Sequence, residues 1–266
     1  MIPLRDICEF LDTFAPLETA EDWDNVGLLV GDPDRMVARV MTCLTVTSDS
    51  VTEAVEDAVD LIVSHHPMPF HPLRRLTTEK TPSRLLLRLI RADVAVYSPH
   101  TAFDSAAHGI NQQLADGLGL TNALPLVVQD PQRPEQGSGR YGLLQRPIKL
   151  ADLAQELRRF LGIAGLHVVG DRNRDVRRIA VACGAAGQFL EPAGQVGCDV
   201  LVTGETTFHT CLEAEALGMG LLLPGHYASE RFAVETLAER LADRFPKLVV
   251  WASRQEKDPL FWANEV

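Results

Sequence analysis

Short apolar runs and longer amphipathic stretches alternate along this chain of 266 residues. The apolar runs, each of strand length, cover residues 39–47, 60–66, 93–100, 177–183, 199–205 and 219–226. Residues 48–59 space their apolar side chains as a helix does, with Ser48 or Asp49 as the expected N-cap, and residues 187–197 predict a short, interrupted helix. Short apolar strands separated by helices are typical of α/β folds in which helices cover mixed, mainly parallel sheets.

The pattern repeats in the two halves of the chain. Residues 129–140 are rich in Pro, Gly, Gln and Ser and predict a linker or exposed loop near the midpoint. On either side, a strand, a helix and a second strand follow in the same order, and Arg39 and Asp60 are as far apart as Arg178 and Asp199. We therefore expect two homologous α/β lobes, although any two strand–helix–strand units share this general pattern.

Composition and charge narrow the class of protein. Hydrophobic residues make up 46% and charged residues 23% of the chain, as in globular proteins. No stretch approaches the roughly 18 uncharged apolar residues of a membrane span, and residues 1–14 space their apolar side chains as an amphipathic helix, not a signal peptide. Five scattered cysteines without a CxxC pair indicate reduced thiols and predict a cytoplasmic location. The formal net charge of −11 argues against a nucleic-acid partner.

Metal-competent side chains follow four of the expected strands. They are His65, His66, His100, Glu205, His209 and His226. Ligands of open α/β sheets collect beyond the carboxyl ends of the strands, so these side chains are expected to serve a site there.

Three short motifs supply the candidate metal ligands. Adjacent histidines at a strand end, His65 and His66, point in different directions and therefore suit two neighbouring ions better than one. Asp104 stands four residues after His100, and imidazole with carboxylate suits Zn, Mn, Fe or Co. The alternative is that Asp104 caps a helix that begins at Ser105.

The third motif is His226 with Glu230. A helix that begins by Tyr227 would place both side chains one turn apart on the same side, whereas a solvated surface pair is the alternative. Together the motifs offer three histidines and two carboxylates, which suits two divalent ions if one carboxylate bridges them and water completes each shell. These ligands do not distinguish among Zn, Fe, Mn, Co and Ni.

The other histidines divide into two groups. His100 and His209 belong to the same constellation and are candidates for proton transfer or for orienting a ligand. The histidines expected to be ordinary helix or loop residues are His71, His108 and His167.

Five ordered motifs resemble one known family. They are EDWDNVGLLVGD (21–32), SHHPMPF (64–70), YSPHTAFDSAAHGIN (97–111), DVLVTGETTFH (199–209) and LLLPGHYASE (221–230). Over nearly the whole chain, their order and spacing are similar to those of the dinuclear-metal proteins labelled GTP cyclohydrolase 1 type 2 homologues or NGG-interacting-factor-like proteins. CGAAGQFL (183–190) replaces the Gly- and Ser-rich turn of many members, and the short segment at 129–140 marks a form without an inserted domain.

The resemblance implies a fold, an assembly and a set of ligands. The fold would be two similar, interlinked α/β lobes, here residues 1–128 with 221–266, which carry most of the ligands, and residues 129–220. The assembly would be a toroidal homohexamer, a trimer of dimers, with metal sites facing a cavity that residues 23–25 also line. One ion would be held by His66, Asp104 and Glu230, and the other by His65, His226 and Glu230. Glu230 would bridge the two ions and joins His100 and His209 as a candidate catalytic residue.

Two functions are compatible with these expectations. The first is a metal-dependent hydrolase of a nucleotide-like or other small substrate, in which metal-activated water attacks a carbonyl, a ring carbon or a phosphorus. The family label indicates a purine nucleotide, although no phosphate-binding glycine loop is present in the sequence. The second is a non-enzymatic ring that stores or delivers metal, or a regulatory scaffold.

Overall fold

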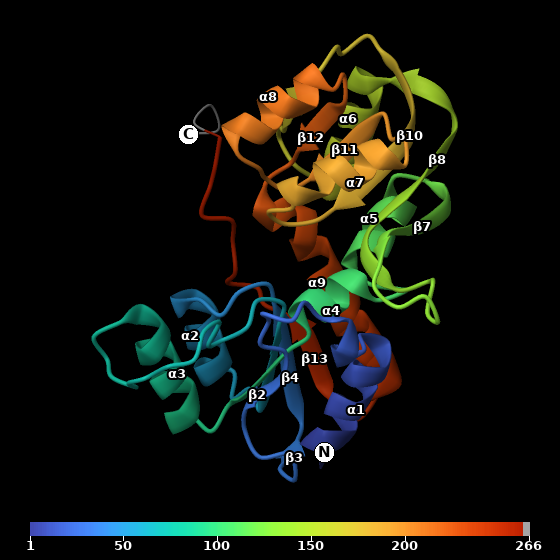
Figure 1. Cartoon of the computed structure of the whole chain (residues 1–266). Helices are drawn as coiled ribbons and strands as arrows, with labels where there is room; N and C mark the ends of the chain where they lie inside the picture. Colours follow the sequence, from blue (N-terminus) through green and yellow to red (C-terminus); the bar gives the residue numbers. More distant parts are fainter. Residues whose placement is uncertain (263–266) are drawn as a thin grey trace. The chain divides into compact units, whose positions relative to one another are not determined.

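The computed structural model describes residues 1–262 and divides into two compact units (Figure 1). The first contains Met1–Phe103 and Ala233–Lys257, and the second contains Asp104–Phe232 together with residues 258–262. These boundaries differ from the expected ones because residues 104–128 and 221–232 lie with the second unit. Strand pairing explains the difference, since residues 121–128 pair with the strand that follows them in that unit.

The first unit contains a five-stranded sheet in the order β13-β4-β5-β6-β2. Its strands are β2 (Gly27–Val30), β4 (Arg39–Cys43), β5 (Leu61–Ser64), β6 (Ala95–Ser98) and β13 (Val249–Ala252), and β1 (Ile2–Pro3) pairs separately with β3 (Met36–Val37). Its helical elements are α1 (Leu4–Phe14), η1 (Leu17–Thr19), α2 (Ser48–Glu56) and α3 (Thr81–Arg91). The four strands β13, β4, β5 and β6 are mutually parallel, and only the edge strand β2 pairs antiparallel.

Helices cover both faces of this sheet. The expected amphipathic helix at the N-terminus is α1, which buries Leu4, Ile7 and Leu11. On the opposite face, α2 and α3 pack on β4 and β5 through a core that includes Val51, Leu85 and Ile62 (Figure 1). The expected N-cap of α2 was wrong by one or two positions. The cap is residue 47, a threonine whose hydroxyl accepts the backbone N–H of residue 50 in a capping box.

A buried carboxylate joins α2 to the chain that follows β13. Glu53, only 4% exposed, accepts hydrogen bonds from the side chains of Trp251 (3.0 Å) and Ser253 (2.7 Å) and from the backbone N–H groups of Arg254 and Gln255. Burial alone would raise the pKa of Glu53, but these hydrogen bonds outweigh burial and lower the pKa to about 2.

Acid should therefore unfold this region through Glu53. Because the folded pKa is lower than the unfolded one, the stabilisation is present above pH 4.5 and is lost as the pH falls toward about 2. Urea unfolding across this pH range should show that Glu53→Gln lowers the free energy of unfolding by on the order of 3 kcal/mol at neutral pH. In acid, the free energy of unfolding of the variant should depend less on pH than that of the wild type. The exposed neighbour Glu56 provides the control, and equal pH profiles for Glu56→Gln and Glu53→Gln would contradict the assignment.

The second unit contains a six-stranded sheet in the order β7-β8-β10-β11-β12-β9. Its strands are β7 (Thr121–Val128), β8 (Gly137–Lys149), β9 (His167–Val169), β10 (Asp175–Ala182), β11 (Val200–Thr203) and β12 (Gly220–Leu223). Its helical elements are α5 (Ile110–Gly117), α6 (Leu150–Leu161), η2 (Gly187–Phe189), α7 (Leu190–Gln195) and α8 (Phe208–Ala216). Strands β10, β11 and β12 are parallel, while β7, β8 and β9 pair antiparallel. Two helices span the unit boundaries in sequence, α4 (His100–Ser105) and α9 (His226–Arg244).

Part of the expected linker is a strand. Residues 129–136 are irregular, but residues 137–140 begin β8 and pair with β7. The glycine-rich composition has a local cause, because a Cβ on Gly137 would lie 2.2 Å from the carbonyl oxygen of Val127. Glycine here permits close pairing of two strands and does not provide flexibility.

Repeated contacts support the expected duplication. In the first unit, Asp60 accepts hydrogen bonds from the N–H groups of residues 38 and 39 (2.7 and 2.9 Å) and pairs with Arg35 at 3.1 Å. In the second unit, Asp199 accepts from the N–H groups of residues 177 and 178 (2.8 and 2.9 Å) and pairs with Arg174 at 3.1 Å. The same offset separates the members of each equivalent pair, so both units begin their parallel strands in the same way.

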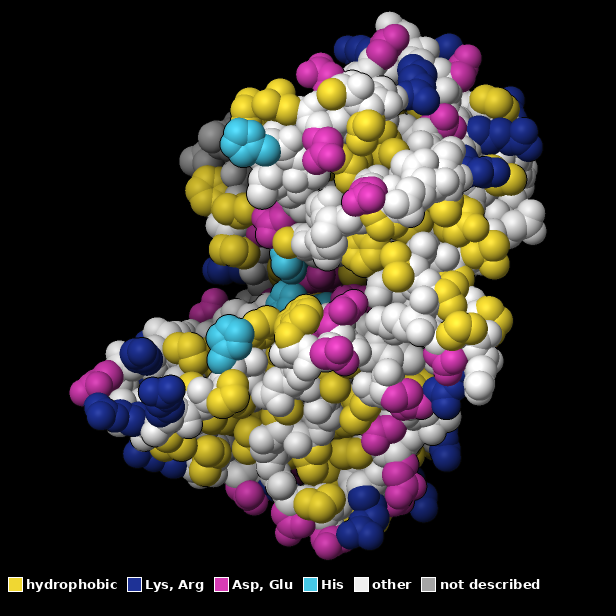
Figure 2. Space-filling model, in the orientation of Figure 1, with side chains coloured by type: hydrophobic (Ala, Val, Ile, Leu, Met, Phe, Trp, Pro, Cys, Tyr) yellow, Lys and Arg dark blue, Asp and Glu magenta, His cyan; other side chains and the backbone are white. Residues whose placement is uncertain are grey.

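None of the helices in the described part of the chain is long and apolar enough to cross a bilayer. On the face drawn in Figure 2, basic side chains of the described residues gather in small groups with acidic side chains among them.

Candidate metal centre

Three histidines of the first unit come together at the carboxyl ends of β5 and β6. His65 and His66 directly follow β5, and their N–H groups extend the pairing with β4 by bonding the carbonyls of residues 43 and 44 (2.9 and 2.8 Å). His100 begins α4 just after β6. One ring nitrogen from each of the three lies within 4.8 Å of the others, so this group could hold a metal ion. His65 and His100 are buried, at 3% and 8% exposure.

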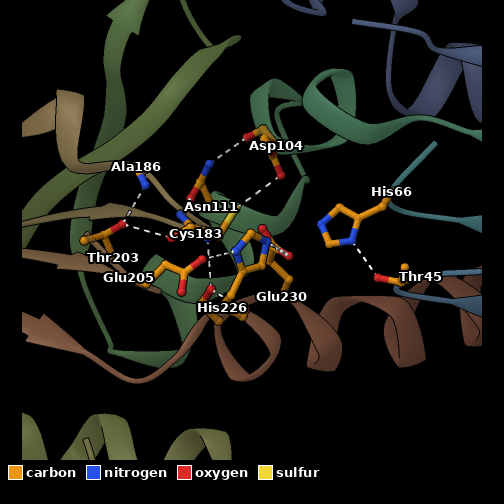
Figure 3. Close-up of polar contacts among 12 residues, drawn as sticks. Thr45, His66, Asp104, Asn111, Cys183, Ala186, Thr203, Glu205, His226 and Glu230 are labelled. Atoms are coloured by element: carbon orange, nitrogen blue, oxygen red, sulfur yellow. Dashed lines mark hydrogen bonds and ion pairs between the residues drawn. The ribbon is translucent and has the colours of Figure 1, made fainter. Parts of the chain in front are cut away.

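The rings of His65 and His66 are held differently, as expected for neighbours on a strand. Their planes are 53° apart, with centroids separated by 5.0 Å. The Nδ1 atom of His66 lies 2.7 Å from the hydroxyl of Thr45 (Figure 3). A held Nδ1 favours Nε2 as the metal-binding nitrogen of His66.

His100 is fixed by a carboxylate from the loop before β2. Its Nδ1 lies 2.7 Å from Oδ1 of Asp24, whose other oxygen accepts from the N–H and hydroxyl of Thr101. Burial by itself would raise the pKa of Asp24, but the hydrogen bonds from His100 and Thr101 outweigh it and lower the pKa to about 2. Asp24 is therefore an anion that accepts the imidazole N–H.

In the second unit, His226 and Glu230 lie one turn apart at the start of α9. Nε2 of His226 is 3.1 Å from Glu230, and Nδ1 is 2.9 Å from Oε1 of Glu205 (Figure 3). The hydrogen bond to Glu230 is the main cause that raises the pKa of His226 to about 9. The expected same-side geometry is confirmed, and the surface-pair alternative is wrong because Glu230 is only 3% exposed.

Asp104 also belongs to the second unit and is not a helix cap. It lies inside α4, which begins at His100, so the capping alternative is wrong. The thiol of Cys183 donates to Oδ1 of Asp104 at 3.2 Å, and the side-chain amide of Asn111 donates to its carbonyl at 3.1 Å (Figure 3). Burial raises the pKa of Cys183 well above its usual value, which keeps the thiol protonated as a donor. Cys183 itself is buried.

Gly184 was not expected to matter, yet it lies directly against the ligand candidates of the second unit. A Cβ there would lie 2.4 Å from Oε1 of Glu230 and 3.5 Å from Nε2 of His226. Its φ of +66° is also a left-handed conformation that glycine adopts most easily. The sequence signal was weak, a glycine directly after a buried strand.

Gly184→Ala should therefore displace the Glu230 carboxylate and weaken metal binding by about 10- to 100-fold, as outer contacts of a metal site commonly do. Titration with Zn²⁺ or Mn²⁺ against a chromogenic chelator measures this change. Gly162→Ala is the matched control, because its φ is also +66° but its Cβ would meet nothing within 4 Å. If both variants lost the same affinity relative to the wild type, backbone strain and not contact with Glu230 would be the cause.

The remaining histidines do not belong to the two groups described above. His209 is exposed in the first turn of α8, with its ring centroid 5.9 Å from that of Phe208, and its proton-transfer role stays a prediction. The three histidines expected to be ordinary are exposed in loops or at an edge strand: His71, His108 and His167. Sequence reasoning did not identify the residues that hold two of the rings: the hydroxyl of Thr45 lies against His66, and the carboxylate of Glu205 accepts from His226.

The donor set fits a divalent transition metal. In the first unit three imidazoles meet at strand ends, and in the second unit His226 lies beside Glu230, while Asp104 accepts the thiol of Cys183. Nitrogen and oxygen donors without thiolate suit Zn, Mn, Fe, Co or Ni. Held Nδ1 atoms are typical of imidazoles that bind a metal through the other nitrogen.

Comparison with known proteins identifies the family of this chain. The family model Duf34/NIF3 (NGG1p interacting factor 3) matches residues 2–259. The chain belongs to the Duf34/NIF3 family. Among its curated relatives is a GTP cyclohydrolase 1 type 2 homolog from Clostridium perfringens, 31% identical over 257 residues that cover 96% of this chain and 98% of the relative. NIF3-like protein 1 from Drosophila melanogaster is 32% identical over 263 residues, which cover 97% and 88% of the two chains.

Solved structures of Duf34/NIF3 proteins share the fold. The crystal structure of Staphylococcus aureus protein SA1388 matches with a TM-score of 0.89 at 28% identity, over 98% of this chain and 99% of that one. The resemblance drawn from five motifs is therefore confirmed, as is the expected α/β fold with helices on mixed, mainly parallel sheets.

Proposed function

We propose that this Duf34/NIF3 protein is a metal-dependent hydrolase that acts on a small, nucleotide-like substrate. Its two divalent ions would be bound by His65, His66, Asp104, His226 and Glu230. The observation that carries the proposal is the convergence in the first unit of the ligand candidates His65 and His66 with His100, with one ring nitrogen of each within 4.8 Å of the others, in a protein whose second unit pairs a histidine with a buried carboxylate. Buried ionisable groups gathered at strand ends are typical of functional sites.

The residues divide the chemical tasks among them. A bound divalent ion acidifies a coordinated water and polarises the bond under attack. Glu230 would share its carboxylate between the two ions, and the orientation of its oxygens supports this, because one faces His226 and the other faces the Cα of Gly184. His100 is placed to move a proton, because it is held in one orientation beside His65 and His66.

The names of relatives support the substrate class. The relative from Clostridium perfringens carries the name GTP cyclohydrolase 1 type 2 homolog, and a ring-opening hydrolysis of a purine nucleotide would use both an activated water and a proton donor. We also propose a cytoplasmic homohexamer, assembled as a trimer of dimers, as the functional form. Light scattering of the purified protein tests the assembly.

Turnover tests the hydrolase directly. Protein stripped with a chelator and reloaded with Zn²⁺, Mn²⁺ or Fe²⁺ should hydrolyse at least one member of a panel of nucleotides, phosphoesters and cyclic amides. Stripped protein and Glu230→Gln should be inactive on the same compound. If reloaded protein nowhere exceeds the Glu230→Gln background, the hydrolase proposal is wrong.

A metal-handling role is the second candidate, favoured by one observation. The side chain of His226 is 35% exposed and the side chain of its partner Glu205 is 53% exposed, so water reaches this candidate ligand and an ion would be able to exchange. Rapid, reversible exchange of Zn²⁺ or Fe²⁺ with a competing chelator, without turnover, would favour storage or delivery. Ions that leave only on denaturation would exclude that role.

A further inference from the structure

We propose that Asp24 is the positioning residue of His100: its carboxylate accepts the Nδ1–H of the imidazole and so makes Nε2 the basic nitrogen of the ring. The task of His100, proton transfer beside the metal ions, rests on the proposed function. The positioning itself is a property of the first unit alone, and its test does not require a substrate.

Asp24 is a buried carboxylate, and both of its oxygens accept hydrogen bonds. Its side chain is 1% exposed, and each oxygen receives two donors. Oδ1 accepts from Nδ1 of His100 at 2.7 Å and from the N–H of Asn25 at 2.8 Å. Oδ2 accepts from the N–H of Thr101 at 3.1 Å and from its hydroxyl at 2.5 Å. A carboxylate accepts hydrogen bonds and cannot donate them, so the shared proton with His100 belongs to Nδ1.

The backbone of His100 gives an independent sign of function. Its φ is +28°, a region in which a non-glycine residue is strained. In the second unit, the equivalent place after Leu223 and Pro224 is occupied by Gly225, with a φ of +101°. Glycine holds such a turn with little strain, so a histidine at the same place indicates that its ring is needed there.

The surroundings place this ring beside the candidate ligands and beside exposed aromatic side chains. Its centroid is 5.1 Å from that of His65 and 5.5 Å from that of His66. On another side are two exposed aromatic rings, Trp23 at 6.0 Å and Phe70 at 5.8 Å, which are 61% and 42% exposed. A fixed imidazole that lies beside metal-competent nitrogens and exposed aromatic rings is suitable for proton transfer.

Replacement of Asp24 by asparagine reverses the hydrogen bond. When the Asn carbonyl oxygen takes the place of Oδ2, both donors of Thr101 keep their acceptor and the N–H of Asn25 loses its own. The amide NH₂ then faces Nδ1 of His100 and donates to it, which moves the ring proton to Nε2. Asp22→Asn makes the same chemical change at an exposed position two residues earlier.

Nitrogen-15 NMR of histidine side chains in the metal-free protein, in mildly alkaline buffer, reads the tautomer directly. The His100 signals, assigned with His100→Gln, should show protonated Nδ1 and unprotonated Nε2 in the wild type and in Asp22→Asn. They should exchange roles in Asp24→Asn. The wild-type spectrum decides the proposal whether or not Asp24→Asn folds, because protonated Nε2 in the wild type would overturn it.

Metal analysis separates this inference from the proposed function. Asp24→Asn should bind as much Zn²⁺ or Mn²⁺ as the wild type, because Asp24 orients a proton-transfer ring and not a ligand. A large loss of metal from this variant would show that His100 is itself a ligand and would overturn its assignment as the proton-transfer ring. If the wild type binds no metal but shows the expected tautomer, the hydrolase proposal fails while the positioning stands.

Discussion

Glu230→Gln is expected to lose most of the bound metal. Glu230 is 3% exposed, lies 3.1 Å from Nε2 of His226 and meets the Cβ position of Gly184 with its other oxygen. A glutamine of the same shape keeps one acceptor oxygen but removes the negative charge that two cations would share. If the carboxylate bridges two ions, both sites weaken together, by more than the roughly 10- to 100-fold typical of residues around the ligands.

Elemental analysis of metal per chain measures the effect, alongside competition with a chelator for the residual ions. The expected result is about two ions in the wild type and well under one in Glu230→Gln. Glu239→Gln makes the same replacement at an exposed position on the same helix and should retain the wild-type content. A wild type that stays free of metal after reconstitution would exclude the proposed centre, and loss of one ion only would exclude the bridge.

The strands and the ligand candidates could be predicted because they depend on local pattern. Buried parallel strands read as short apolar runs, and polar residues that end such runs stand out, as His65, His66 and His226 did. The i,i+4 spacing of His226 and Glu230 was equally visible, because helix geometry alone places them on one side.

What surrounds these residues could not be predicted, because it depends on contacts between distant segments. Asp24 reaches His100 across 76 positions, and Cys183 reaches Asp104 across 79. No periodicity marks such pairs. The start of β8 was predicted to be part of a linker for a related reason. Its glycines permit close approach to β7, and the sequence does not identify this partner strand.

Arg140 is another residue whose importance only the structure reveals. It lies at the end of the segment expected to be a linker, where an arginine suggests an exposed side chain. It is instead 1% exposed, and its guanidinium donates to six oxygen atoms. They are the side-chain oxygen of Gln112 (3.1 Å) and the carbonyls of Gly137 (2.6 Å), Gly139 (2.7 Å), Ser105 (3.3 Å), Ala106 (2.7 Å) and Glu135 (3.3 Å). Burial lowers the pKa of Arg140 to about 10, so the charge is retained at neutral pH.

Arg140→Met should destabilise the second unit by about 4 kcal/mol, because it leaves several buried carbonyls without a donor, each at a cost of about 1–3 kcal/mol before relaxation. Urea unfolding followed by circular dichroism measures this loss. Arg140→Lys should recover only part of it, because an ammonium has three donors and lacks the planar fork that reaches separate carbonyls. Arg146→Met, at an exposed position on the same strand, should change stability by less than about 0.5 kcal/mol.

The location of the damage tests the physical reason. Two of the carbonyls belong to Ser105 and Ala106, which directly follow Asp104. The other three belong to the turn between β7 and β8 and to the first residues of β8. Hydrogen exchange in Arg140→Met should therefore rise first in β7, in β8 and at the end of α4, before global unfolding. Because Asp104 is a proposed ligand on that same helix, metal affinity should fall with it. Uniform loss of protection across the second unit, with metal affinity unchanged, would mean that Arg140 stabilises the sheet as a whole and not the segment that carries Asp104.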